Sequence, residues 1–149
     1  MQGNEAFRAE YEARPWLKHY PDYITPELTP RFASGLAMFL ETAQTMPKQA
    51  AIYYFDQSMS FGELDRKSTA LAVALKERGV TQGDRIAFYL QNIPQFLIAL
   101  YAAWKVGAIV VTCNPMFKQR ELEYHLNDSG AKGLICLESL YEAIARDVI

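Results

Sequence analysis

The sequence is poor in the residues that form metal centres, disulfides and nucleic-acid surfaces. Of its 149 residues, two are cysteine and two are histidine. They form no Cys-x-x-Cys or histidine pair, so we expect no zinc site. Cys113 and Cys136 both lie in apolar runs, which favours two buried thiols in a reducing compartment over a disulfide. The 15 basic and 17 acidic residues are mixed along the chain and leave a net charge of −2, which argues against nucleic-acid binding.

The two common glycine-rich phosphate loops are also missing. Ser129-Gly-Ala-Lys132 resembles part of one. It follows a predicted helix and precedes a predicted strand, which is the reverse of the order that a phosphate loop needs. We therefore interpret Gly130 as a helix C-cap. No nucleophile–base pair or carboxylate cluster stands out, and the sequence gives no catalytic, cofactor-binding or metal-binding residue.

The sequence does not predict a secretory signal or a membrane-spanning helix. Residues 1–10 are polar and lack the apolar segment of a signal peptide. The apolar run from Ile93 to Cys113 contains Lys105 and Gly107, and after them its composition changes to β-branched residues. This pattern fits a buried helix followed by a buried strand, so we expect a cytoplasmic protein.

Prolines and aromatic residues alternate in residues 1–30. Proline spacing beyond Pro15 forbids a long helix there and favours an extended arm. The aromatic side chains suggest that the arm has a docking surface, in the same chain or in a partner. Residues 31–149 have the composition of a globular unit with its own core, and half of all residues in the chain are hydrophobic.

Apolar periodicity and turn residues in this second part predict alternating helices and strands. Helices are expected at residues 32–45, from Ser60 to Gly79, from Asn92 to Lys105, and at 118–127 and 138–148. A hairpin is expected from strands 50–55 and 59–61, and further strands at 85–90, 108–113 and 132–137. The fold class is therefore α/β, with a partly parallel βαβ sheet, flanking helices and a β-hairpin. Ala108 to Cys113 is uninterrupted by polar residues apart from Thr112, as in a central strand covered on both faces.

The carboxyl ends of the strands are where open α/β sheets bind ligands. Two such ends carry polar residues, Gln91-Asn92 and Asn114-Pro115-Met116. We expect Asn92 to cap the following helix, which has Pro94 in its first turn. For Asn114, a role in an Asn-Pro turn and a role facing a ligand both remain open.

Aromatic side chains elsewhere are expected to pack. Tyr101 and Trp104 fit a helix that is apolar on nearly every side, so we place them in the core. Tyr53, Tyr54 and Phe55 are consecutive, so their strand presents aromatic rings on both faces and needs cover on both, from the rest of the domain or from a neighbour.

Several motifs in order resemble the adenylate-forming superfamily. They are Met59-Ser-Phe-Gly-Glu-Leu64, Gly79-Val-Thr-Gln-Gly-Asp-Arg85 with Leu90-Gln-Asn-Ile-Pro94, Trp104-Lys-Val-Gly-Ala108 through Asn114-Pro115, and Arg120-Glu-Leu-Glu-Tyr-His-Leu-Asn-Asp-Ser-Gly-Ala-Lys132. Within them, Glu63, Lys105, Gly107, Asn114 and Pro115 are expected to be scaffold. The arm segment Arg14-Pro-Trp-Leu-Lys-His-Tyr-Pro-Asp-Tyr23 resembles the start of bacterial long-chain fatty-acid–CoA ligases.

The resemblance implies a fatty-acid substrate, ATP, Mg²⁺ and coenzyme A for an intact ligase of lipid metabolism. The family's phosphate loop, adenine-contacting segment, ribose-binding aspartate and catalytic lysine have no counterpart in this sequence. We therefore expect an inactive N-terminal fragment with no bound cofactor, which forms part of a larger N-terminal domain. Its last residue, Ile149, lies inside a helical pattern. Open strand edges should make it self-associate.

Two alternatives remain. One is a standalone flavodoxin-like binding or regulatory module, and the other is a fragment of an aryl-, acetyl- or amino-acid-activating ligase. A homodimer of the intact enzyme, its membrane association and the chain length of its fatty acid stay open.

Overall fold

The computed structural model describes residues 8, 9 and 11–149, which form two units divided between Ala33 and Ser34. In the first unit, residues 15–33 contain one short 3-10 helix, η1 (Pro15–His19). It follows Arg14, whose φ is 48° and whose guanidinium pairs with Glu27. The absence of a long helix beyond Pro15 is therefore confirmed.

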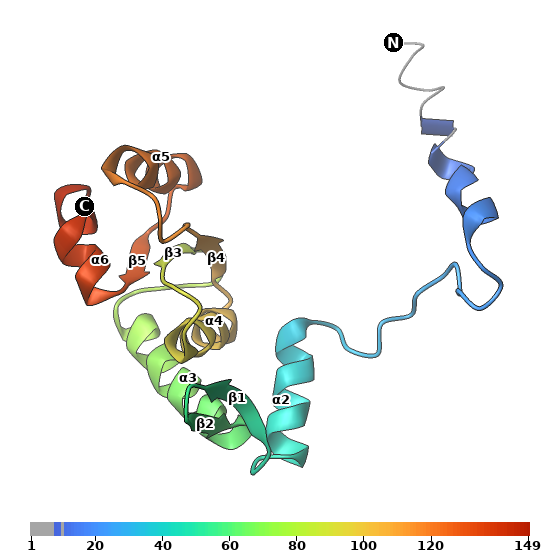
Figure 1. The fold of residues 1–149 in the computed structure, drawn as a ribbon, viewed down its shortest axis with the longest axis horizontal. Coiled ribbons are helices and arrows are strands. Elements are labelled where there is room, and N and C mark those ends of the chain that lie inside the picture. Colours follow the sequence, from blue (N-terminus) through green and yellow to red (C-terminus); the bar gives the residue numbers. More distant parts are fainter. Residues whose placement is uncertain (1–7, 10) are drawn as a thin grey trace. The chain divides into compact units, whose positions relative to one another are not determined.

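The second unit alternates helices and strands, as predicted (Figure 1). Its elements are α2 (Gly35–Thr45), β1 (Ala50–Tyr54), β2 (Gln57–Ser60), α3 (Phe61–Glu77), β3 (Arg85–Tyr89), α4 (Pro94–Lys105), β4 (Ile109–Thr112), α5 (Gln119–Ser129), β5 (Gly133–Cys136), α6 (Glu138–Ala143) and η2 (Ala145–Asp147). β1 and β2 form an antiparallel hairpin, and the other three strands form a parallel sheet in the order β4-β3-β5. The predicted α/β class is confirmed.

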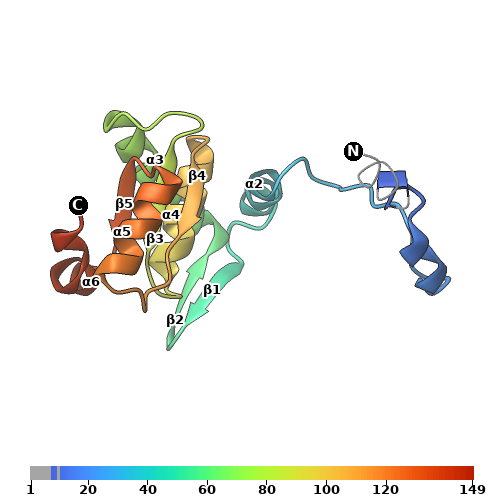
Figure 2. The same cartoon turned by 90° about the horizontal axis from the view of Figure 1, so that it is seen from above.

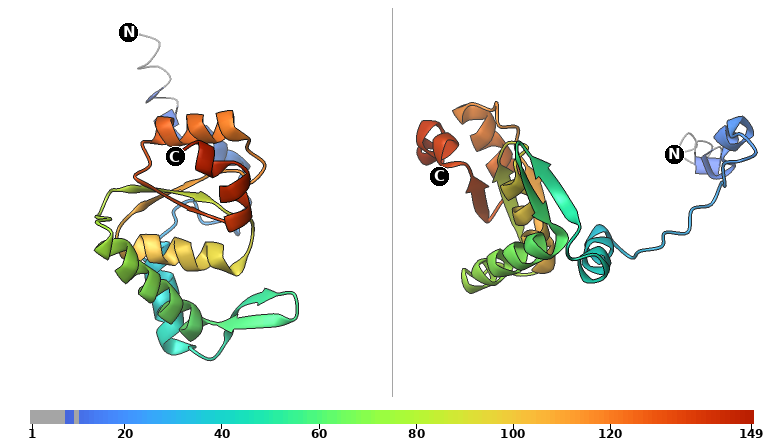
Figure 3. Two further views of the ribbon diagram at one scale, coloured as in Figure 1. Left: turned by 90° about the vertical axis from the view of Figure 1, so that its left-hand side faces the viewer. Right: turned by 60° about the horizontal axis from the view of Figure 1, so that its bottom comes forward.

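Both faces of the parallel sheet are covered by helices (Figures 1 and 3). Successive residues of β3 point to opposite faces, so Phe88 packs with α3 and α4, whereas Ala87 and Tyr89 pack with α5 and the C-terminal segment. All four residues from Ile86 to Tyr89 are at most 2% exposed. β3 is therefore the central strand of the sheet.

A third cluster joins α2, the hairpin and α4. Phe39 of α2 stacks on Tyr101 of α4 with ring centroids 3.7 Å apart, and Leu64 of α3 completes the buried set. The hairpin leads directly into α3 through a capping box: the Ser60 hydroxyl accepts from the Glu63 N–H, and the Glu63 carboxylate accepts from the Ser60 N–H. The predicted cap at Ser60 is confirmed.

Three predictions about burial and continuity were wrong. β4 forms one border of the three-stranded sheet and is not central, because β3 lies between it and β5. Most apolar side chains of α4 are only partly buried, and Trp104 is 36% exposed, because only the side that carries Ala99, Ala102 and Ala103 is fully buried in the core. The final helix ends at Ala143, since Ile144 has a φ of −143° and a 3-10 turn follows.

The boundaries of the first elements also differ from those predicted. α2 begins at Gly35 instead of residue 32, because Ser34 caps it. The hairpin loop is Phe55-Asp56, and Gln57 and Ser58 belong to β2. The hairpin extends away from the parallel sheet (Figure 2), so the expected cover for its aromatic residues is absent within the second unit: Tyr53 and Phe55 are 80% and 89% exposed. Among the described residues, no helix combines the length and apolar character needed to cross a membrane.

A polar contact fixes the start of the sheet. Asp84 Oδ2 accepts hydrogen bonds from the main-chain N–H and the hydroxyl of Thr81 at 2.7 and 2.9 Å, and from Lys132 Nζ at 2.8 Å. Lys132 first, then Thr81, lower the pKa of Asp84 from 3.8 to about 2. The contact therefore links the loop before β3 to the residue before β5.

The pH dependence of folding should reveal this contact. The depressed pKa means that Asp84 stabilises the folded state fully above pH ~4, and that this contribution disappears as the pH falls towards 2. We expect Asp84→Asn to lower the urea midpoint at pH 6 and to approach wild type near pH 2.5. Asp128→Asn, at an exposed position of α5, is the control. Parallel pH profiles for wild type and Asp84→Asn would contradict this assignment.

Candidate functional site

The carboxyl ends of β3, β4 and β5 lie at one edge of the sheet, because the three strands are parallel. The helix after β3 packs on one face and the helix after β4 on the other. The connection after β3 leads to β4 on one side of it, and the connection after β4 leads back across β3 to β5 on the other side. The direction of the connections thus reverses beside β3, and open α/β sheets bind ligands in the crevice outside such a point. This edge is the candidate functional site.

Asn114 follows β4 at this edge and forms a turn. Its side-chain oxygen accepts from the main-chain N–H of Met116 at 2.9 Å, and its main-chain oxygen accepts from the N–H of Phe117 at 2.9 Å. The turn directs the chain into α5 and leaves Met116 76% exposed. Of the two roles considered for Asn114, the structure supports the turn, since its acceptor groups are engaged within it.

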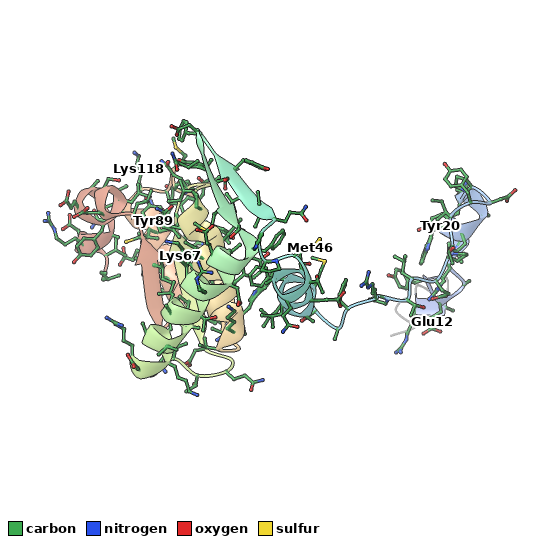
Figure 4. All side chains as sticks on the ribbon, turned by 90° about the horizontal axis from the view of Figure 1, so that it is seen from below. Glu12, Tyr20, Met46, Lys67, Tyr89 and Lys118 are labelled. Carbon is green, nitrogen blue, oxygen red and sulfur yellow. The ribbon has the colours of Figure 1, made fainter. Side chains whose placement is uncertain are left out.

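Tyr89, at the end of β3, forms a hydrogen bond with this turn. Its hydroxyl donates to the main-chain oxygen of Phe117 at 2.5 Å, and its side chain is fully buried. Burial raises the pKa of Tyr89, and the nearby Cys113 and Cys136 raise it further by smaller amounts. Figure 4 labels Tyr89 on β3 and Lys118 at the start of α5. The sequence interpretation missed Tyr89, although a tyrosine inside a buried strand must find a partner for its hydroxyl.

Asn92, after β3, does not cap α4. Ile93 is the N-cap residue, without a side-chain hydrogen bond, and Pro94 occupies the first turn. The predicted cap was therefore wrong: the helix starts one residue later, and a proline there needs no capped N–H.

Asn92 is exposed and lines a hollow of about 350 Å³ between β1 and the start of α4. The other lining residues are Ile52, Tyr53, Tyr54, Ile93, Pro94, Phe96 and Leu97.

A second hollow, of about 480 Å³, lies beside the turn on the α5 side. Its walls are Phe117, Arg120, Glu121, Tyr124 and His125. Phe117 and His125 face each other with ring centroids 4.6 Å apart. The hollow offers aromatic surfaces and a guanidinium. No hydrogen bond joins a nucleophile to a base among these five residues, so the geometry gives no catalytic pair.

The described residues do not form a site that fits ATP with Mg²⁺. No group of three His, Cys, Asp or Glu among them could hold a metal ion. The glycines with positive φ, at 79, 83, 107 and 130, are not consecutive in the chain and none begins a helix, whereas a phosphate loop presents consecutive N–H groups at a helix start. Gly130 caps the end of α5, as predicted. Cys113 and Cys136 are both free, and burial raises the pKa of each thiol.

Lys105, at the end of α4, reaches across to α3. Its ammonium donates to the main-chain oxygen of Asp65 at 2.9 Å, and to the side chains of Asp65, Ser68 and Thr69 at 2.6, 2.8 and 2.7 Å. The Lys105 side chain is 12% exposed. α4 runs opposite to the strands it connects, so Lys105 lies at the end of the sheet away from the candidate site.

Glycine 107 and Glu63 also have local structural roles. Gly107 has a φ of 74°, and a Cβ there would lie 3.0 Å from the Gln82 side chain. Its main-chain oxygen accepts from the N–H of Gly83 at 2.9 Å. Hydrogen bonds from Ser60 lower the pKa of Glu63: the main-chain N–H has the larger effect and the hydroxyl the smaller one. These contacts, with those of Lys105 and Asn114, agree with a scaffold role for the motif residues.

Sequence comparisons match most of the chain. The sequence model of the family described as AMP-binding enzyme matches residues 39–148. The chain is 35% identical over 135 residues to a long-chain-fatty-acid–CoA ligase of Yersinia pestis, and 33% identical over 128 residues to one of Bacillus subtilis. These alignments cover 89% and 86% of this chain but 24% and 23% of the relatives. The chain thus spans about a quarter of the length of these curated relatives.

Solved structures with the same fold include two enzymes that form adenylates. Bacillus subtilis o-succinylbenzoate CoA synthetase (MenE), in complex with the acyl-adenylate OSB-AMP, is 30% identical with a TM-score of 0.64, over 70% of this chain and 28% of that one. The N-terminal subdomain of Klebsiella oxytoca NpsA is 25% identical with a TM-score of 0.69, over 74% and 28%. The architecture described above is therefore that of the N-terminal subdomain of adenylate-forming enzymes.

Replacing Lys105 should loosen the α3–α4 pair. Lys105→Met removes the ammonium and leaves the oxygens of Asp65 and Ser68 without their donor, so we expect the free energy of unfolding to fall by about 2–3 kcal/mol. Lys76→Met, at an exposed position of α3, is the matched control. Urea unfolding followed by circular dichroism measures both. In the Lys105→Met background, Asp65→Asn should cost less than in wild type; equal costs would contradict a direct interaction.

Proposed function

Because the chain belongs to the family of AMP-binding enzymes, we propose that it is the N-terminal part of a long-chain-fatty-acid–CoA ligase. The intact enzyme would join a fatty acid to coenzyme A with ATP. This chain would supply part of the scaffold of the larger N-terminal domain.

One observation carries the choice of long-chain ligases within the family. Long-chain ligases from Yersinia pestis and Bacillus subtilis align with 89% and 86% of the chain. Alignments of that length extend well in front of residue 39, where the family match begins, and take in part of the proline-rich first unit. MenE and NpsA cover 70% and 74% of the chain at lower identity. The likeness to long-chain ligases thus includes sequence outside the shared core.

The proposed reaction has two steps. The fatty acid carboxylate attacks ATP, with Mg²⁺ assisting, to give an acyl-adenylate and pyrophosphate; the coenzyme A thiol then displaces AMP to give the thioester. Stabilisation of phosphoryl charge dominates the first step in such chemistry. The described residues do not fit the nucleotide or the metal, so no step is assigned to them, and we propose that the chain alone is inactive.

A second candidate is a fragment of a ligase for another acid. MenE and NpsA favour it, since solved structures of these proteins are complexes with the acyl-adenylate OSB-AMP and with 3-hydroxybenzoyl-AMSN, respectively. Both have the same fold as this chain at 25–30% identity. The family match over residues 39–148 argues against a standalone flavodoxin-like module.

The isolated 149-residue chain should not catalyse adenylation. With palmitate, ATP and Mg²⁺, we expect exchange of labelled pyrophosphate into ATP at the level of a protein-free blank, because the residues that would bind nucleotide are not among those described. An intact long-chain ligase serves as positive control. Exchange clearly above the blank would refute the proposed inactivity.

A chimera tests the choice of substrate class. The aligned segment of the Bacillus subtilis long-chain ligase is replaced by this chain, and acyl-CoA formation is measured with palmitate, benzoate and acetate. We expect activity within about tenfold of the parent and the same preference for palmitate, since conservative repacking of a scaffold is generally tolerated. The same chain inserted into MenE should support less activity. The reverse ranking of the two chimeras would favour the second candidate.

A further inference from the structure

The ammonium of Lys105 lies in a small pocket that other helices build. Four oxygens of α3 surround its nitrogen at 2.6–2.9 Å: the main-chain oxygen and Oδ1 of Asp65, Oγ of Ser68 and Oγ1 of Thr69. The ring of Phe39, from α2, faces the same nitrogen with its centroid 5.6 Å away. None of these five groups comes from α4, so the pocket belongs to α2 and α3, and α4 supplies only the ammonium that fills it.

Contacts that do not involve the ammonium hold the pocket in place. The Ser68 hydroxyl donates to the main-chain oxygen of Asp65 at 3.1 Å, which leaves its own lone pairs available to accept. Ser68 is 0% exposed and Phe39 is 2% exposed. The Phe39 ring is also stacked on Tyr101. Because one helix carries the oxygens and packing fixes the ring, the pocket should persist when the nitrogen is removed.

The chemistry of the pocket selects a small, singly charged cation with N–H donors. Asp65 supplies one negative charge, and the hydroxyls and the main-chain carbonyl are neutral. Distances of 2.6–2.9 Å fit N⁺–H···O hydrogen bonds, whereas oxygens bind magnesium and calcium at about 2.0–2.6 Å. An aromatic face attracts a cation that lies within about 6 Å of its centroid. Lysine offers three N–H donors to the four oxygens, and a free ammonium ion offers four.

We propose that this pocket of Asp65, Ser68, Thr69 and Phe39 is a binding site for one ammonium ion, and that Lys105 fills it as a tethered ligand. Removal of the nitrogen alone then leaves a vacant site that free ammonium enters. Thr69 is exposed, so the ion reaches the site from solvent. Every group of the pocket lies within the second unit. The inference therefore depends neither on the proposed function nor on what adjoins this chain in a longer protein.

Chemical rescue tests the site. Lys105→Met keeps an unbranched side chain up to the last carbon and removes the nitrogen, so it opens the site with little change in packing. Urea unfolding is compared in ammonium chloride and in equimolar tetramethylammonium chloride, whose cation is larger and has no N–H. At about 0.5 M salt and a dissociation constant of about 0.1 M, ammonium should raise the folding equilibrium constant of the variant about sixfold. Wild type, whose site is filled, and Lys76→Met, at an exposed position of α3, give the general salt effect and should lack this gain.

A second substitution locates the bound ion. Asp65→Asn in the Lys105→Met background removes the one negative charge of the pocket, so the gain from ammonium should fall to the level of Lys76→Met. A gain in Lys105→Met no larger than in wild type would overturn the proposal. A gain that Asp65→Asn leaves unchanged would also overturn it, because the ion would then bind elsewhere. If Lys105→Met is unfolded without ammonium, helical circular dichroism is followed as each salt is added, and failure of ammonium to restore it counts against the site.

Discussion

The ammonium of Lys105 is the contact on which the arrangement of this fold depends. It joins α4 to α3 through four oxygens, from one main-chain carbonyl, one carboxylate and two hydroxyls. α3 and α4 together cover one face of the sheet, and α3 is the direct continuation of the hairpin. Fixing the end of one helix on the first turns of the other therefore sets the position of the sheet, the hairpin and α2 at once. A residue of the motif Trp104-Lys-Val-Gly-Ala108 thus acts at the end of the sheet away from the candidate site.

Local rules predicted the features that local chemistry determines. Ser60 with Glu63 three residues later formed the expected capping box, and Gly130 ended α5 in a left-handed conformation. Predictions that depended on which other elements pack beside a helix or strand were less accurate. The composition of Ala108–Cys113 correctly predicts an apolar strand, but composition does not say how many strands lie beside it. Asn92 was a reasonable cap by residue type, yet Pro94 moved the start of α4 to the next residue.

The candidate site was predictable in position but not in chemistry. Strand–helix alternation predicts a parallel sheet, and a parallel sheet gathers its carboxyl ends at one edge. Asn114 was found there, with its turn. Tyr89 was not, because its role depends on the Phe117 carbonyl, 28 residues further along the chain. The motifs identify the family because they encode helix caps, a glycine turn and an inter-helix contact, and such features recur wherever the same scaffold is built.

The distribution of exposed groups follows from how the helices cover the sheet. Helices cover both faces of the parallel sheet, so its apolar side chains are largely satisfied within the second unit. Among the described residues, the main chain remains unpaired at both borders of the sheet, β4 and β5, and the aromatic end of the hairpin is exposed. The hairpin is irregular at both ends: Phe55 in its turn has a φ of 53°, a strained conformation for a bulky residue, and the register of β1 shifts between Ala50 and Ile52 at the other end. The parallel sheet, by contrast, keeps a regular register on both sides of β3.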